Sequence, residues 1–110
     1  MEKRRVVITG MGAVTPLGLT LDESWAAVKE NRCGIGPITQ YDTSEQKVKL
    51  AGEVKGFDPA VCMDNREARK LDRYVQFALA CAKEAMDQSG LCVDAENAGR
   101  CAVFFASGVG

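Results

Sequence analysis

The chain has 110 residues, with 14 Lys and Arg against 15 Asp and Glu, five cysteines and no histidine, and this length allows one domain at most. A net charge of −1 provides no global field to hold polyanions, which argues against a general nucleic-acid or membrane-surface role. Without histidine, Ser-His and Cys-His nucleophile pairs and imidazole-containing zinc sites are excluded from this chain.

The cysteines show neither a disulfide framework nor a metal-binding pattern. They are odd in number, never form a C-x-x-C pair, and stand at positions 33, 62, 81, 92 and 101. Cys81 lies between two alanines in a predicted helix with no base to lower its pKa, so packing explains it better than nucleophilic catalysis. We therefore expect reduced thiols, a cytoplasmic protein, no metal and no cofactor.

The first predicted strand is Val6-Val7-Ile8, which is apolar on both faces as in a parallel sheet covered by helices. The stretch Gly10-Met11-Gly12-Ala13-Val14-Thr15 follows, with two of the three glycines of a dinucleotide-binding fingerprint. Thr15 occupies the third position, and no strand ending in an acid follows at the usual distance. Two interpretations stay open, a nucleotide site and a plain turn that needs positive φ.

The next predicted element is a helix over residues 21–32. Thr20 and Glu23 have the spacing of a capping box, and an apolar stripe then recurs at helical spacing through Leu21, Trp25 and Val28. Gly34 supplies a stop for this helix.

Residues 34–47 are rich in Gly, Pro, Thr, Asp and Ser, which predicts an irregular surface connection. Residues 48–54 then alternate in a way that predicts a half-exposed strand. Asp64 and Glu67 open a long helical stretch that carries Leu71 and an alanine face and ends at Gly90. The apolar run 101–106 resembles a central strand that enters a glycine turn.

The alternation of strands and helices predicts an α/β fold, a mostly parallel sheet with helices on both faces. In such a sheet the strands of Val6 and Val103 are parallel neighbours or near neighbours, and the helix over 71–89 packs through its alanines. Natural domains rarely end in a turn that has just left a buried strand. We therefore expect residues 1–110 to be an incomplete domain, the N-terminal segment of a larger one.

A cluster of cations stands at the start of the long helical stretch, with helical spacing through Arg66, Arg69, Lys70 and Arg73. Cations at this end of a helix oppose its dipole, which favours acids there. The residues alone leave two interpretations open, a solvated face and a binding site for an acidic partner.

Several motifs, taken together and in order, resemble the N-terminus of the β-ketoacyl-acyl-carrier-protein synthase II family. They are Arg4-Arg5-Val6-Val7-Ile8-Thr9-Gly10-Met11-Gly12, Thr15-Pro16-Leu17-Gly18, Trp25, Tyr41-Asp42-Thr43-Ser44, Ala51-Gly52-Glu53-Val54, Phe57-Asp58-Pro59, Arg69-Lys70-Leu71-Asp72-Arg73, Ala85-Met86-Asp87-Gln88-Ser89-Gly90-Leu91 and Ser107-Gly108-Val109-Gly110. The resemblance covers nearly the whole chain. It implies the N-terminal portion of a thiolase-like layered fold, a homodimer of the full-length enzyme, and a role in fatty acid biosynthesis.

The resemblance also implies which functional residues lie in this chain and which lie outside it. In the family a cysteine takes an acyl group from a carrier-protein thioester, and malonyl-carrier protein loses CO2 and attacks it, with two histidines assisting. These groups lie beyond residue 110, so we expect no catalytic residue here and no activity of this segment alone. Arg66, Arg69 and Lys70 match the basic surface that docks the acidic acyl carrier protein. Val109 matches a residue that lines the acyl pocket.

Three alternatives remain. A polyketide ketosynthase or its chain-length partner would share this N-terminus and differ in regions beyond it. A small module that binds an acidic protein would use the same cations without any chemistry. A nucleotide-binding protein would use the glycines at positions 10 and 12.

Overall fold

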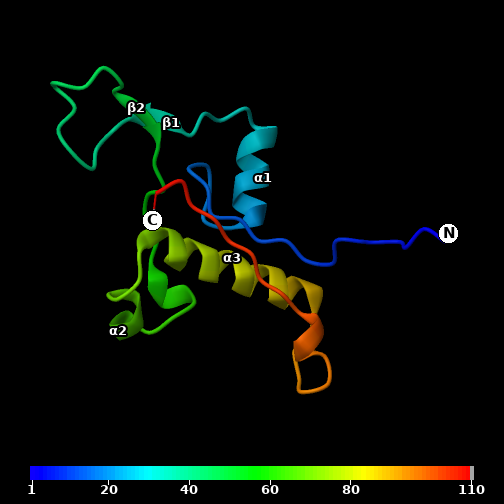
Figure 1. Ribbon diagram of the computed structural model, residues 1–110. Coiled ribbons are helices and arrows are strands. Elements are labelled where there is room, and N and C mark those ends of the chain that lie inside the picture. Colours follow the sequence, from blue (N-terminus) through cyan, green and yellow to red (C-terminus); the bar gives the residue numbers. More distant parts are fainter. Residues whose placement is uncertain (110) are drawn as a thin grey trace. The chain divides into compact units, whose positions relative to one another are not determined.

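The computed structural model describes residues 1–109 (Figure 1). The chain divides into two compact units. Of the described residues, Met1–Gly12 together with 59–109 form unit 1, and Ala13–Asp58 form unit 2. Unit 1 is therefore discontinuous in sequence, since all of unit 2 lies between its two pieces.

Unit 2 begins with the helix α1, Leu21–Lys29, as the capping pattern predicts. The Thr20 hydroxyl accepts a hydrogen bond from the Glu23 amide at 3.2 Å, and the Glu23 carboxylate accepts one from the Leu19 amide at 2.8 Å. The first bond satisfies an amide that a helix N-terminus leaves without a partner, and the second holds the preceding chain against the first turn. The start of the predicted helix is thus confirmed.

The end of α1 differs from the prediction, because the helix stops three residues before position 32. Asn31 adopts the left-handed conformation with φ of 55°. Asparagine tolerates this conformation better than most residues and can therefore end a helix as glycine does. Asn31, and not Gly34, supplies the stop.

An antiparallel pair of short strands completes unit 2. The strand β1, Ile35–Pro37, pairs with β2, Leu50–Gly52, in the register Ile35 with Gly52 and Pro37 with Leu50. β2 confirms part of the strand predicted over 48–54, whereas β1 lies in a segment predicted to be irregular. Its Gly and Pro are turn residues by composition, and only pairing with β2 makes them a strand.

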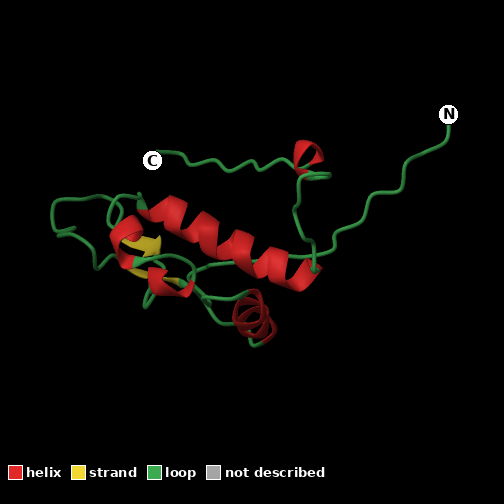
Figure 2. Ribbon diagram, turned by 90° about the horizontal axis from the view of Figure 1, so that it is seen from below, coloured by secondary structure: helices red, strands yellow, loops and turns green. Residues whose placement is uncertain are grey.

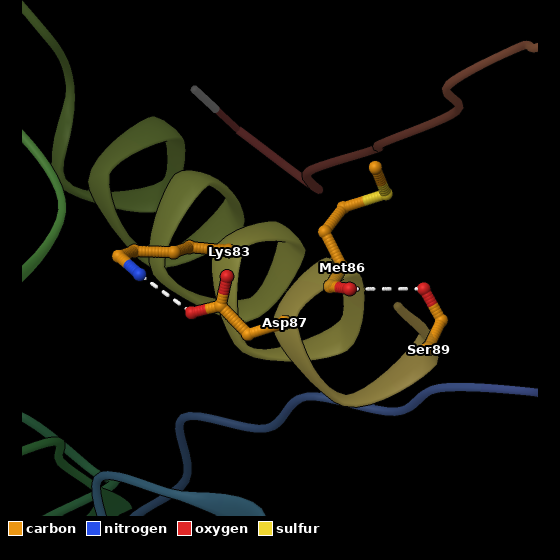
Figure 3. Close-up of polar contacts among 4 residues, drawn as sticks. All are labelled: Lys83, Met86, Asp87 and Ser89. Atoms are coloured by element: carbon orange, nitrogen blue, oxygen red, sulfur yellow. Dashed lines mark hydrogen bonds and ion pairs between the residues drawn. The ribbon is translucent and has the colours of Figure 1, made fainter. Parts of the chain in front are cut away.

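Unit 1 contains the longest helix, α3, Arg73–Ser89, flanked by η1 (Pro59–Val61), α2 (Asn65–Ala68) and η2 (Ala98–Arg100). As predicted, α3 ends at Gly90, which has φ of 66°. Figure 3 shows its last turns, where the Ser89 hydroxyl donates to the Met86 carbonyl at 3.0 Å and Lys83 pairs with Asp87 one turn along the helix. Asp87 raises the pKa of Lys83 through this hydrogen bond.

The segment around Gly10 and Gly12 lies directly on the backbone of α3. A Cβ atom at Gly12 would overlap the carbonyl oxygen of Cys81, and one at Gly10 would overlap that of Ala85. The small side chains of α3 and the missing side chains of the two glycines permit this approach. α3 is therefore approached closely at Cys81 and Ala85, but by an extended segment and not by the predicted sheet.

The predicted mostly parallel sheet is wrong for the residues that the structure describes. Their only paired strands are β1 and β2, which are antiparallel, and neither 6–8 nor 101–106 forms a strand (Figure 2). Val6 is 90% exposed and Val103 80%, so neither segment has neighbours on its two faces. An apolar run becomes a strand only when a second strand accepts its main-chain hydrogen bonds, and these two runs do not pair with each other.

The segment 101–109 is extended and runs back along α3 toward the N-terminal end of that helix (Figures 1 and 2). A hollow of about 280 Å³ lies between Val103 and Phe105 of this segment and α3 residues such as Ala78 and Ala82. No helix of the part that the structure describes is long and apolar enough to cross a membrane.

Candidate functional site

The candidate site is the basic cluster that Arg66, Arg69 and Lys70 form between η1 and α3. Arg66 lies in α2, Arg69 caps the end of that helix, and Lys70 follows directly. The Asp64 carboxylate accepts a hydrogen bond from the Arg66 amide at 3.1 Å and so starts α2 where the sequence predicts a helix.

The cations do not share one helix face, contrary to the prediction of a continuous helical stretch. α2 ends at Ala68, and α3 begins at Arg73 after Asp72, whose backbone is extended with ψ of 151°. Arg66 therefore belongs to one helix, and Arg73 opens the next. The helical spacing of the cations crosses a turn that separates two helices.

Main-chain hydrogen bonds define the turn between α2 and α3. The Lys70 amide donates to the Glu67 carbonyl at 2.9 Å, and the Leu71 amide donates to the Ala68 carbonyl at 3.2 Å. The Gln76 side chain adds two bonds from α3, to the carbonyl oxygens of Ala68 at 2.8 Å and Leu71 at 3.3 Å. Sequence reasoning missed Gln76, because no local pattern announces a contact that spans two helices.

The side chains of the basic cluster are exposed to solvent. Arg66, Arg69 and Lys70 are all exposed, and among the described residues they form no ion pair. Arg73 differs, because its guanidinium lies 4.9 Å from the centre of the Phe77 ring. All four cations are thus exposed, and Arg73 alone among them lies over an aromatic ring of its own helix.

Two partly buried cysteines, Cys62 and Cys81, lie in unit 1. Burial raises the pKa of the Cys62 thiol, which keeps it protonated at neutral pH, and the nearby charge of Lys83 opposes this only in part. Cys81 is half-buried within α3. Within residues 1–109 no group of three or more His, Cys, Asp or Glu side chains could hold a metal ion.

Gly10 and Gly12 have a structural explanation that needs no nucleotide. Both face the backbone of α3, and neither has positive φ, so the predicted turn with positive φ is wrong here. A phosphate-binding glycine turn leaves room for the ligand above the main chain. In this chain α3 occupies that room.

Val109 lies at the far end of the described chain and is 94% exposed. The Ser107 hydroxyl donates a hydrogen bond to the Val109 carbonyl oxygen at 3.0 Å. The segment 101–109 ends near the N-terminal end of α3, and the basic cluster immediately precedes that helix (Figure 1). The two predicted binding elements therefore approach the same end of α3.

Comparison with known proteins shows the family to which this chain belongs. The family described as "Beta-ketoacyl synthase, N-terminal domain" matches residues 3–110. The chain belongs to this family. The solved structure of the ishigamide ketosynthase/chain length factor is 34% identical in sequence with a TM-score of 0.73, over 83% of this chain and 23% of that one. The chain therefore has the fold of the N-terminal part of a ketosynthase, which belongs to the thiolase-like class.

Individual members of this family are also similar to the chain in sequence. The "3-oxoacyl-[acyl-carrier-protein] synthase 2" of Coxiella burnetii is 46% identical over 110 residues, and that of Synechocystis sp. 42% identical over 110 residues. The protein of the same name in Staphylococcus aureus is 39% identical over 109 residues. The matches span 99–100% of this chain but only 26–27% of the relatives. The chain thus covers about a quarter of the length of these proteins.

Proposed function

We propose that residues 1–110 are the N-terminal segment of a 3-oxoacyl-acyl-carrier-protein synthase domain in fatty acid biosynthesis. The observation that carries this proposal is the similarity over the whole chain to proteins of that name, at up to 46% identity. In this reaction a malonyl thioester loses CO2, and the resulting carbanion attacks the acyl group that is bound as a thioester to the enzyme's cysteine. A carbon–carbon bond forms, the cysteine thiolate leaves, and the product is a carrier-bound 3-oxoacyl thioester two carbons longer.

We assign no catalytic residue of this reaction to the chain. It has no histidine, and its half-buried Cys62 has a raised pKa. The nucleophile and the two histidines then belong to a part of the synthase outside these 110 residues, and the whole enzyme is a cytoplasmic homodimer. Val109 is proposed to line the acyl pocket beside that nucleophile.

The partner proposed for Arg66, Arg69 and Lys70 is the acidic acyl carrier protein with an acyl or malonyl group. Three exposed cations without ion pairs in the described chain complement an acidic surface. Such complementarity speeds association and selects the partner more than it adds affinity. In the structure Arg66 lies in the last turn of α2 and Arg69 caps its end, so the helix dipole does not oppose these two cations.

The chemical part of the proposal is tested by incubating the purified 110-residue chain with acyl- and malonyl-carrier protein. We expect no 3-oxoacyl product above background from the chain alone, and condensation from the complete synthase. Product formed by the 110-residue chain would refute the assignment of the catalytic groups to other residues.

The docking part is tested by reversing Arg66, Arg69 and Lys70 to Glu in the complete protein. We expect weaker carrier-protein binding, mainly through slower association at low salt. The melting temperature should change little, because exposed charges contribute about 1 kcal/mol or less each. Unchanged affinity for the carrier protein would show that the cluster is only a solvated face and not a docking site.

A second candidate is a polyketide ketosynthase or its chain-length partner. The similarity in fold and sequence to the ishigamide ketosynthase/chain length factor favours it. The two candidates differ in product, since a fatty acid synthase system reduces each 3-oxo group before the next extension. Mass spectrometry of carrier-bound products from the complete protein, supplied with malonyl-carrier protein, distinguishes a single extension from repeated extension without reduction.

A further inference from the structure

Gln76 links α3 to the basic cluster. Its Nε2 atom donates hydrogen bonds to the carbonyl oxygens of Ala68 at 2.8 Å and Leu71 at 3.3 Å. Ala68 is the last residue of α2, and Leu71 comes directly after Lys70. The two acceptors therefore enclose Arg69 and Lys70 in the sequence.

The segment that carries these cations contains only a very short helix. α2 has only four residues, and a helix of this length is not stable by itself in water. The carbonyl of Ala68, the last residue of α2, accepts from the Leu71 amide and from the Gln76 side chain. The same side-chain amide donates to the Leu71 carbonyl, so the first turn of α3 adds two bonds to the main-chain bonds of the turn.

We propose that Gln76 is a positioning residue for the docking site of Arg66, Arg69 and Lys70, an inference that rests on the proposed function. Gln76 carries no charge and does not itself attract the carrier protein. By fixing the main chain from Ala68 to Leu71, it reduces the conformational entropy that Arg69 and Lys70 lose when the partner binds. Loss of the two hydrogen bonds therefore weakens docking while every cation is retained.

The test substitutes Gln76→Met in the complete protein, which keeps the side-chain length and removes both donors. Gln88→Met is the matched control, because Gln88 also lies in α3 and its side chain also contacts the main chain, accepting from the Met11 amide at 2.7 Å. Hydrogen exchange is measured at the amides of residues 69–71. Binding of holo-acyl carrier protein is measured at low and high salt.

With Gln76→Met we expect exchange at residues 69–71 to rise about fivefold, the loss that one net hydrogen bond implies. Carrier-protein affinity should fall about threefold or more at low salt. Gln88→Met should change neither quantity. Gln76→Lys, whose ammonium group can donate to the same carbonyls, should restore the slow exchange, which general loss of stability would not explain.

If Gln76→Met fails to fold, Gln76→Asn replaces it, because the same amide on a shorter chain no longer reaches both carbonyls. Unchanged exchange at residues 69–71 in a folded variant would overturn the inference. So would unchanged carrier affinity with Gln76→Met when charge reversal of the cluster weakens binding, and the proposed function would then stand. If charge reversal itself has no effect on binding, the docking proposal fails and the inference fails with it.

Discussion

At the scale of single residues, Glu53 illustrates how hydrogen bonds set the ionisation of an exposed carboxylate. It accepts bonds from the Thr39 amide at 3.0 Å, the Thr39 hydroxyl at 2.8 Å and the Gln40 amide at 3.3 Å. The bond from the Thr39 amide is the main cause that lowers the pKa of Glu53. These bonds fasten the chain that leaves β1 to the residue that follows β2.

The sign of the pH effect follows from this lowered pKa. The carboxylate of Glu53 stabilises the folded state above the unfolded pKa of about 4.3, and this contribution disappears as the pH falls through the lower folded value. We expect Thr39→Val, which removes the hydroxyl donor, to shift the pKa of Glu53 back upward. Carboxyl NMR titration measures this shift, and an unmoved pKa would show that the hydroxyl bond is not formed.

The close approach of Gly12 to α3 gives a second prediction at this scale. Gly12→Ala places a methyl group against the carbonyl oxygen of Cys81, and a helix backbone cannot move aside locally. We expect a loss of about 2 kcal/mol or more in the free energy of unfolding. Gly99→Ala is the control, since nothing lies within 4 Å of its added Cβ. Equal stability of the two variants in urea unfolding would contradict the packing described.

At the scale of elements, the helix starts differ in a way that mutation can detect. Thr20 caps α1 with a hydrogen bond of 3.2 Å to the Glu23 amide, whereas Asp72 makes no side-chain capping bond to α3. We therefore expect Thr20→Ala to cost about 1 kcal/mol. Asp72→Ala should cost less, because only the attraction of its charge to the helix dipole is lost. Denaturant unfolding of both variants checks this order, and a larger loss for Asp72→Ala would reverse it.

The elements also show which structural features could be predicted from neighbouring residues alone. Thr20 and Gly90 mark helix ends by contacts within a few residues, so the start of α1 and the end of α3 could be predicted. β1 could not, because Ile35, Gly36 and Pro37 form a strand only through pairing with residues 50–52. The break between α2 and α3 is bridged by Gln76, whose side chain donates from the next helix, a contact that no local pattern indicates.

The candidate site follows the same rule. The identity of its cations could be read from the sequence, but their arrangement could not, since α2 ends at Ala68 and leaves Arg69 and Lys70 in the turn before α3. The segments 6–8 and 101–106 failed as strands for a related reason. Their apolar residues favour a strand that is covered on both faces, but composition does not show whether other strands or helices are present to cover it.

At the scale of the whole molecule, the exposed apolar segments predict self-association. Val6 is 90% exposed and Phe104 91%, and both lie in extended runs without strand partners in the described chain. Such runs pair readily with another chain. We expect the 110-residue chain at micromolar concentration to sediment as more than a monomer, and Phe104→Lys to reduce this association.

Tyr41→Lys is the control for that experiment, because Tyr41 is 60% exposed but lies outside any apolar run. It should leave sedimentation unchanged. A clean monomer with a sharp cooperative melt would contradict the prediction and indicate a domain that is stable by itself.

The interrupted path of unit 1 also has a consequence for synthesis on the ribosome. Residues 1–12 are made before unit 2, but the α3 backbone on which Gly10 and Gly12 rest is made only after it. Closing a loop of that length costs entropy before any contact compensates for it. Gly10 and Gly12 therefore lack this packing partner until α3 has been synthesised, while α1 and the β1–β2 pair form from residues closer together in the sequence.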